Sequence, residues 1–168
     1  MIATRSVIQR RDHHRHSAQS VAVSLASRFI VKNAVRAWAV QPDLQWPFES
    51  VDWLAGLLPH RSSAKVEQVR LDNCRAEWVE APTRSSARAI LYLHGGAFLT
   101  CGLNTHRALV GRLSQAADAG ALNVGYRMLP LHPISDAIDD GISGLRWLLR
   151  HGYAADEIVV AGDSAGRY

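Results

Sequence analysis

The residues best placed to do chemistry surround a serine near the end of the chain. The pentapeptide Gly-Asp-Ser-Ala-Gly occupies residues 162–166 and directly follows the apolar residues 158–161. A serine that attacks an acyl group stands on a sharp turn after a strand. The residues two positions before and after it must be small because they crowd neighbouring backbone. Ser164 is therefore the candidate nucleophile.

A second candidate element is a short glycine-rich stretch. His94, Gly95, Gly96 and Ala97 directly follow the apolar run 89–93. Glycines allow backbone N–H groups to come close to a substrate oxygen, where they can stabilise a developing negative charge. A plain glycine turn after a strand is the alternative interpretation. Both motifs follow predicted buried strands, so we expect the two loops to meet at one end of a sheet.

The elements that must position these motifs alternate between strand and helix. The apolar patterns predict strands at 66–71, 74–80, 89–93, 121–126 and 157–161, and helices at 105–117 and 135–151. We expect Asn104 or Thr105 to cap the start of the first helix and Gly120 to stop it. Strands that alternate with helices predict an α/β fold with a mostly parallel sheet and flanking helices.

The N-terminal part of the chain has a different pattern. Residues 1–18 are rich in arginine and histidine and lack periodicity, which predicts a disordered basic arm. Residues 19–60 are predicted to form a helical cap segment, and residues 61–168 the α/β core. The first cap helix carries Arg28, Lys32 and Arg36 on one face. Such a helix can pack on the rest of the protein or lie on a membrane surface.

Composition and charge exclude several classes of function. The net charge of +4 is concentrated in residues 1–36, whereas a nucleic-acid binder spreads basic residues over a folded face, so no nucleic-acid partner is expected. No apolar run is long enough for an integral membrane span.

Cys74 and Cys101 stand far apart and form no metal-ligand pattern, which suits a reducing, cytoplasmic location. Export is the alternative, because arginines followed by the apolar residues 21–26 faintly resemble a secretory leader.

The motifs together resemble a known family. With the segment Asn123–Pro133, they resemble the hormone-sensitive-lipase-like family of α/β-hydrolases, also called GDXG esterases, over about residues 60–168. The resemblance implies a partial α/β-hydrolase fold with an N-terminal helical cap. It also implies hydrolysis of small-molecule carboxylic esters through an acyl-enzyme, with neither a cofactor nor a metal.

The resemblance also assigns roles to residues. It makes Ser164 the nucleophile and gives the oxyanion hole to the backbone N–H groups of Gly96, Ala97 and Ala165. Its loop support consists of His94, Gly95 and Asp163. Ala97 replaces the third glycine of the family's HGGG loop, and it can serve if this position does not need a positive φ. Arg167 stands where the family usually has a small residue.

The family's acid and general-base histidine follow the serine in chain order, whereas only Ala165 to Tyr168 follow Ser164 here. We therefore expect a chain that is truncated after the nucleophile turn and is weakly active or inactive by itself. One alternative is a non-catalytic remnant that binds an acyl ligand or a protein partner. Another is an enzyme of the same fold that cleaves an amide, peptide or thioester bond. The oligomeric state is left open.

Overall fold

The computed structural model describes residues 21, 24–25, 28–29, 32–41, 48–57 and 63–167. The predicted basic arm 1–18 lies outside the described residues. The chain divides into two compact units, residues 1–46 and 47–168. The first unit contains α2 (Lys32–Val40), on which Lys32, Arg36 and Val40 are exposed. In the described ranges, no helix combines the length and apolar content that a membrane span requires.

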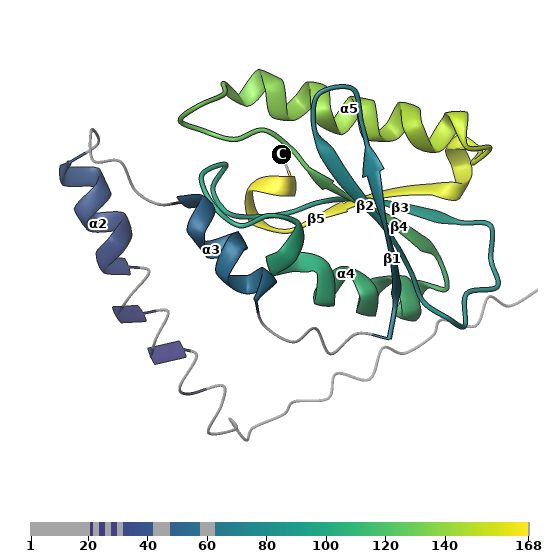
Figure 1. Cartoon of the computed structure of the whole chain (residues 1–168), viewed down its shortest axis with the longest axis horizontal. Coiled ribbons are helices and arrows are strands. Elements are labelled where there is room, and N and C mark those ends of the chain that lie inside the picture. The colour runs from purple at the N-terminus through teal and green to yellow at the C-terminus, as the bar shows by residue number, and fades with distance from the viewer. Residues whose placement is uncertain are drawn as a thin grey trace, which may run out of the picture. The chain divides into compact units, whose positions relative to one another are not determined.

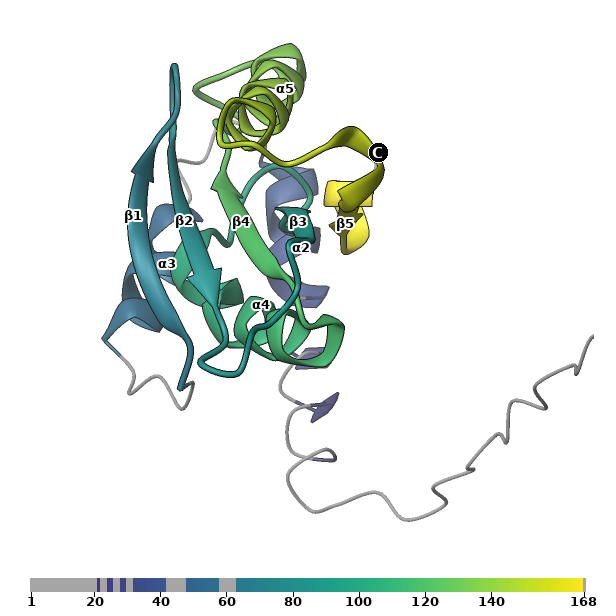
Figure 2. The same cartoon turned by 90° about the vertical axis from the view of Figure 1, so that its right-hand side faces the viewer.

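The second unit is built on a five-stranded sheet. Its strands are β1 (Lys65–Arg70), β2 (Arg75–Glu80), β3 (Ala89–Leu93), β4 (Gly120–Gly125) and β5 (Ile158–Gly162). They lie in the order β1-β2-β4-β3-β5, so that β1 and β5 form the two edges (Figure 2). β4, β3 and β5 are parallel, and β2 is antiparallel to both β1 and β4. The α/β class is confirmed, with a mixed sheet whose parallel part carries both motifs.

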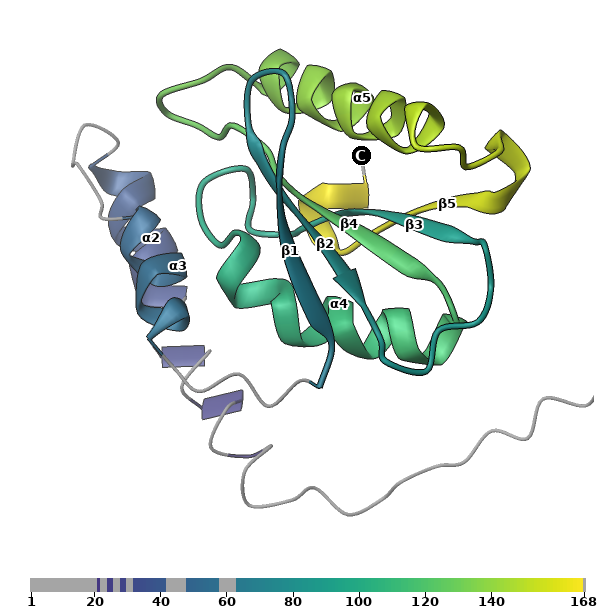
Figure 3. The same ribbon diagram turned by 45° about the vertical axis from the view of Figure 1, so that its right-hand side comes forward.

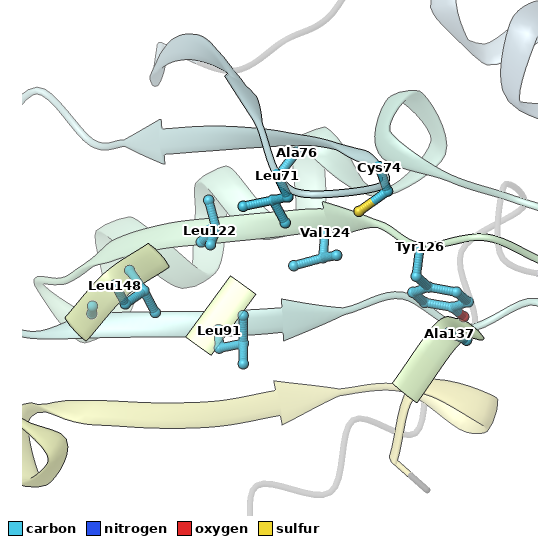
Figure 4. Packing of buried hydrophobic residues seen from close by; sticks show 10 residues of the cluster. Leu71, Cys74, Ala76, Leu91, Leu122, Val124, Tyr126, Ala137 and Leu148 are labelled. Atoms are coloured by element: carbon cyan, nitrogen blue, oxygen red, sulfur yellow. The ribbon is translucent and has the colours of Figure 1, made fainter. Parts of the chain in front are cut away.

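Two long helices cover opposite faces of this sheet. α4 (Leu103–Ala117) lies on one face and α5 (Ile134–Arg150) on the other (Figure 1). The core beneath α5 is built on the sheet residues Leu91, Leu122 and Val124, with Tyr126 and Leu148 beside them (Figure 4). The core beneath α4 is smaller and is centred on Val79, Val110 and Ala121. Each helix therefore has its own apolar layer, as expected for an α/β sandwich.

α5 confirms the predicted helix, but the face that it buries against the sheet is not the one with its large apolar residues. Its buried residues are mostly small or polar: Ala137, Asp140, Gly141, Ser143, Gly144 and Leu148. The large residues of its apolar stripe remain exposed, namely Ile134, Ile138, Ile142 and Leu149. The small face brings the helix close to the sheet, because a side chain added at Gly144 would lie 2.9 Å from Leu91 Cδ1. The apolar period predicted the helix, whereas close packing selected which face is buried.

The predicted capping residues of α4 were wrong, although the helix ends at Ala117 as predicted. The helix begins at Leu103, and Asn104 and Thr105 lie within its first turn. The backbone N–H groups of both residues donate to the carboxylate of Asp52, at 3.3 and 2.8 Å. Asp52 belongs to α3 (Phe48–Gly56), so the capping group comes from a distant part of the sequence. At the other end, the helix stops at a left-handed residue, Asp118 (φ 49°), and Gly120 instead begins β4.

Two fully buried carboxylates fasten the helices to the sheet. Glu77 of β2 accepts hydrogen bonds from Arg107 of α4 and from Gln68 of β1. On the other face, Asp140 of α5 accepts the backbone N–H of Arg127 at 2.8 Å and the guanidinium of the same residue at 3.0 Å. Buried charges are tolerated only when they are paired in this way. Both pairs therefore fix the helices relative to the strands that carry the site.

Candidate active site

The candidate nucleophile stands on a strained turn. β5 ends at Gly162, and a short 3-10 helix, η3 (Ser164–Arg167), begins immediately after Asp163. Ser164 has φ 47°, a left-handed conformation that costs a non-glycine residue about 1–2 kcal/mol. Its side chain is nevertheless exposed rather than packed against the sheet. The strain therefore holds the hydroxyl clear of the strands, as a nucleophile requires.

The two glycines that flank the serine make this turn possible. A Cβ atom at Gly166 would lie 2.0 Å from the backbone oxygen of Leu93, and one at Gly162 would lie 2.6 Å from the same oxygen. Both distances are far below van der Waals contact, and the carbonyl concerned belongs to the neighbouring strand β3. The turn after β5 thus rests directly on the backbone of β3, and only glycine fits at either position.

The glycine-rich loop lies at the same end of the sheet as this turn. Leu93 at the end of β3 pairs in parallel with Gly162, so residues 94–97 and 163–166 leave the sheet side by side (Figure 3). The backbone N–H of Gly95 donates to Asp163 Oδ1 at 2.8 Å. The structure therefore brings the two sequence motifs together.

The loop contains three successive residues with positive φ. The φ angles are 131° at Gly96, 57° at Ala97 and 58° at Phe98. The loop closes on itself, because the N–H groups of Leu99 and Thr100 both donate to the carbonyl of Gly96. Ala97 therefore does not meet the condition that this position has no positive φ. The alanine keeps its backbone N–H but adopts the left-handed conformation that a glycine would adopt with less strain.

Asp163 joins the turn to its surroundings. Its carboxylate accepts the Tyr92 hydroxyl and the Gly95 N–H, both at 2.8 Å, and lies 3.4 Å from His106 Nε2. Burial by itself would raise the pKa of this carboxyl group, but the two hydrogen bonds and the nearby imidazole outweigh it, so that the net shift is downward. The Asp163 carboxylate is thus held ionised beside the serine.

His94 is fully buried beneath the loop. Its ring stacks on Tyr126 with the centroids 4.2 Å apart, and its Nδ1 donates to the carbonyl of Gly95 at 2.8 Å. The Tyr126 hydroxyl donates to the backbone oxygen of His94 itself. Burial lowers the pKa of His94 more than the bond to Gly95 raises it, so the imidazole is neutral at neutral pH. His94 therefore contacts the backbone of the loop from the buried side.

A surface hollow opens beside the serine. It has a volume of about 700 Å³ and is lined by Phe98, Ser164, Ala165 and Arg167. Phe98 supplies an apolar wall, and the exposed Arg167 supplies a positive charge. An exposed hydroxyl next to a loop of backbone N–H groups, open to a hollow of this size, is suited to acyl transfer from a small substrate.

Several supporting residues were not identified from the sequence. Tyr92 and His106 contact Asp163 but belong to neither motif. Tyr126, which lies in the segment Asn123–Pro133 that carries the family resemblance, donates to the backbone oxygen of His94. Strand alternation could have placed Tyr92 on the same face as His94, because they are two residues apart. No spacing in the sequence connects His106 to Asp163, since α4 and the turn after β5 meet only in the folded chain.

The metal-ligating side chains and the cysteines of the described residues are dispersed. Among the described residues, no group of histidine, cysteine and carboxylate side chains could hold a metal ion. Cys74 and Cys101 are both free thiols. Burial is the main cause that raises the pKa of the Cys74 thiol, to about 12, and Cys101 shifts in the same direction. Neither cysteine is therefore a thiolate at neutral pH.

Comparisons with known proteins agree with this geometry. Residues 90–167 match a family described as the alpha/beta hydrolase fold. The chain is 47% identical over 131 residues to esterase LipU of Mycobacterium tuberculosis, covering 76% of this chain and 44% of LipU. An esterase/lipase structure from an uncultured bacterium superposes with a TM-score of 0.65 at 39% identity, over 81% of this chain and 47% of that one.

A third similar protein comes from the hormone-sensitive lipase family. An esterase from the bacterial hormone-sensitive lipase family superposes with a TM-score of 0.62 at 33% identity, over 68% of this chain and 39% of that structure. The chain thus spans about half the length, or less, of these relatives. Partial coverage of this kind fits an N-terminal half.

Proposed function

Because the chain belongs to the α/β-hydrolase fold and is similar to hormone-sensitive-lipase-like esterases, we propose that it carries the nucleophile and oxyanion hole of a serine carboxylic-ester hydrolase. The observation that supports this most directly is the contact between the turn that carries Ser164 and the loop at residues 94–97. Asp163, the neighbour of the serine, is hydrogen-bonded to Gly95 of that loop.

In this proposal Ser164 Oγ attacks the ester carbonyl carbon, and its proton passes to the leaving alcohol as an acyl-enzyme forms. Water then cleaves the acyl-enzyme, which releases the carboxylic acid and restores the serine hydroxyl. The backbone N–H groups of Gly96, Ala97 and Ala165 donate to the oxyanion that develops on the carbonyl oxygen. His94, Gly95 and Asp163 act as positioning residues that hold the loop against the turn. The substrate is a small carboxylic ester seated in the hollow beside Phe98.

The described histidines are engaged elsewhere, and we assign none of them as the general base. His94 Nδ1 binds Gly95, and the ring nitrogens of His106 face Thr105 and Asp163. His132 pairs with Asp136, and His151 binds a carbonyl of its own helix. A serine without a base is a poor nucleophile at neutral pH. We therefore expect the chain by itself to hydrolyse esters weakly.

A fluorophosphonate probe tests this proposal without requiring turnover. The purified chain should be labelled slowly, and the change Ser164→Ala should abolish the labelling because the attacking oxygen is lost. Ser135→Ala is the matched control, since Ser135 is an exposed serine on α5 and should leave the labelling unchanged. A folded chain that shows no labelling dependent on Ser164 would contradict the proposal and favour a non-catalytic binding protein.

A further inference from the structure

A second hollow lies on the face of the sheet that α5 covers, away from Ser164. Its volume is about 270 Å³, and its lining consists of Glu67, Val69, Trp78, Trp147, His151 and Tyr153. These residues come from β1, from β2, from the end of α5 and from the segment that follows it. We call this site the aromatic hollow. The proposed ester hydrolysis uses none of its residues.

Three aromatic side chains form adjoining walls of the aromatic hollow. The Trp78 ring lies 5.9 Å from that of Trp147 and 5.6 Å from that of Tyr153, with interplanar angles of 43° and 40°. All three residues are only half-buried and line the hollow, so part of each ring borders the open space. Aromatic faces that surround a small space bind methylated and quaternary ammonium groups through cation–π attraction.

The walls are held in place before any ligand arrives. The Trp78 indole N–H donates to Glu80 at 3.0 Å, and its six-membered ring fits over Gly120, where an added Cβ would lie only 2.0 Å from Cζ2. Trp147 is stacked on His151 at 3.7 Å, and His151 Nδ1 donates to the Trp147 carbonyl. Walls that are already fixed lose little entropy on binding, which favours affinity.

The charges around the aromatic hollow favour a cation. Glu67 lies directly opposite Trp78 in the β1–β2 register, is exposed, and forms no ion pair with any residue that the structure describes. The guanidinium of Arg84 already lies over Trp78 and Tyr153, 5.7 and 6.0 Å from the ring centres. Its charge is offset by Glu80 at 2.9 Å. The Glu67 carboxylate is therefore available to a ligand.

We propose that the aromatic hollow binds an organic cation with a methylated or quaternary ammonium group. The trimethylammonium group could belong to a free choline-like molecule or to a lipid headgroup. Neither the labelling of Ser164 nor ester hydrolysis enters this inference, so each proposal can fail without the other.

Choline chloride, titrated into the full chain and followed by the indole N–H signals in NMR spectra, tests the proposal. Sodium chloride at equal ionic strength is the salt control. The signals of Trp78 and Trp147 should shift with choline but not with 3,3-dimethyl-1-butanol, which has the same shape without the charge. Equal shifts with the two compounds, or no shift with choline, would overturn the proposal.

Two variants locate the site. Glu67→Gln should weaken choline binding about fivefold, because it removes the nearest carboxylate. Asp139→Asn should leave it unchanged, since Asp139 is an exposed carboxylate elsewhere on α5. Trp147→Leu should abolish the shift of the Trp78 signal, while circular dichroism checks that the chain stays folded. Undiminished binding by a folded Trp147→Leu chain would place the cation elsewhere and refute the aromatic hollow.

Sedimentation with vesicles then distinguishes the two sources of the cation. If the ligand is a lipid headgroup, the chain should sediment with phosphatidylcholine vesicles but not with phosphatidylglycerol vesicles, and Glu67→Gln should reduce the effect. Binding of choline without sedimentation identifies a soluble cation. Sedimentation only with phosphatidylglycerol, together with no response to choline, would contradict the proposal.

Discussion

The two ends of the parallel strands are held together by different atoms. Backbone atoms make the contacts at the carboxyl ends, and side chains make them near the amino ends. At the carboxyl ends, the turn after β5 rests on the Leu93 carbonyl, and the loop after β3 binds Asp163 through a backbone N–H. Near the amino ends, the aromatic hollow is formed by side chains such as Trp78, whose ring covers Gly120. Backbone atoms in a sheet have little freedom to move, whereas the Trp78 ring can shift if it gives up its contacts with Glu80 and Trp147. The two ends should therefore differ in their tolerance of substitution.

Replacing a glycine by alanine at each end tests this difference most strongly. In Gly166→Ala the new Cβ would lie 2.0 Å from a backbone oxygen, and in Gly120→Ala it would lie 2.0 Å from a ring carbon. We expect Gly166→Ala to lower the free energy of unfolding by about 3 kcal/mol and to abolish fluorophosphonate labelling. Gly120→Ala should cost about 1 kcal/mol, keep the labelling and change the indole signal of Trp78. Urea denaturation measures both free energies.

Gly141→Ala is the control for these two variants. A Cβ atom there would lie 3.7 Å from the Leu93 side chain, at ordinary contact distance, and the position is helical. The change should leave stability unaltered or raise it by about 0.5 kcal/mol. A loss as large as that of Gly166→Ala would contradict the view that contact with backbone sets the cost.

Asp163→Asn tests the polar contacts at the carboxyl ends. The variant replaces an ionised acceptor that binds Tyr92 and Gly95, so the free energy of unfolding near neutral pH should fall by about 1 kcal/mol. The pKa of Asp163 is lowered from its ordinary value of 3.8, so its ionisation stabilises the folded chain above that pH. This stabilisation is lost as the pH falls through the lowered pKa.

The difference between wild type and Asp163→Asn should therefore be full well above pH 3.8 and shrink progressively as the pH falls below 3.8. Urea denaturation of both chains at each pH measures this. Tyr92→Phe, made alone and together with Asp163→Asn, completes a double-mutant cycle, because it removes one donor and leaves the carboxylate. A difference that grows on acidification would refute a lowered pKa for Asp163.

Ala97→Gly is expected to have the smallest effect on stability, and it should stabilise the chain rather than destabilise it. Ala97 has φ 57°, so a glycine there should relieve strain and raise the free energy of unfolding by about 0.5 kcal/mol. Labelling of Ser164 should persist, because the backbone N–H is retained. Ala137→Gly, at a buried position in α5, is the matched control and should destabilise by about 1 kcal/mol. Destabilisation of the Ala97→Gly chain would show that the loop needs the methyl group.

Much of the scaffold could be read from local patterns. The apolar run Ala89–Leu93 coincides with β3, and the period of apolar residues placed α5 to within a residue at each end. The glycines at 162 and 166 indicated a tight turn, because their small size is a local requirement of that backbone path. These features depend on neighbours in the sequence, and they could therefore be predicted.

The remaining features depend on contacts between distant segments. The first turn of α4 is capped by Asp52 of another helix, and Asp163 is held by Tyr92 and by a histidine of α4. The exposed stripe of α5 follows from close packing of its small face on the sheet. The sequence by itself determined the strands, the helices and the two motifs, since periodicity and glycine spacing are local. Only the tertiary structure decided which side chains support the serine and where an aromatic hollow forms, because those contacts join residues far apart in the chain.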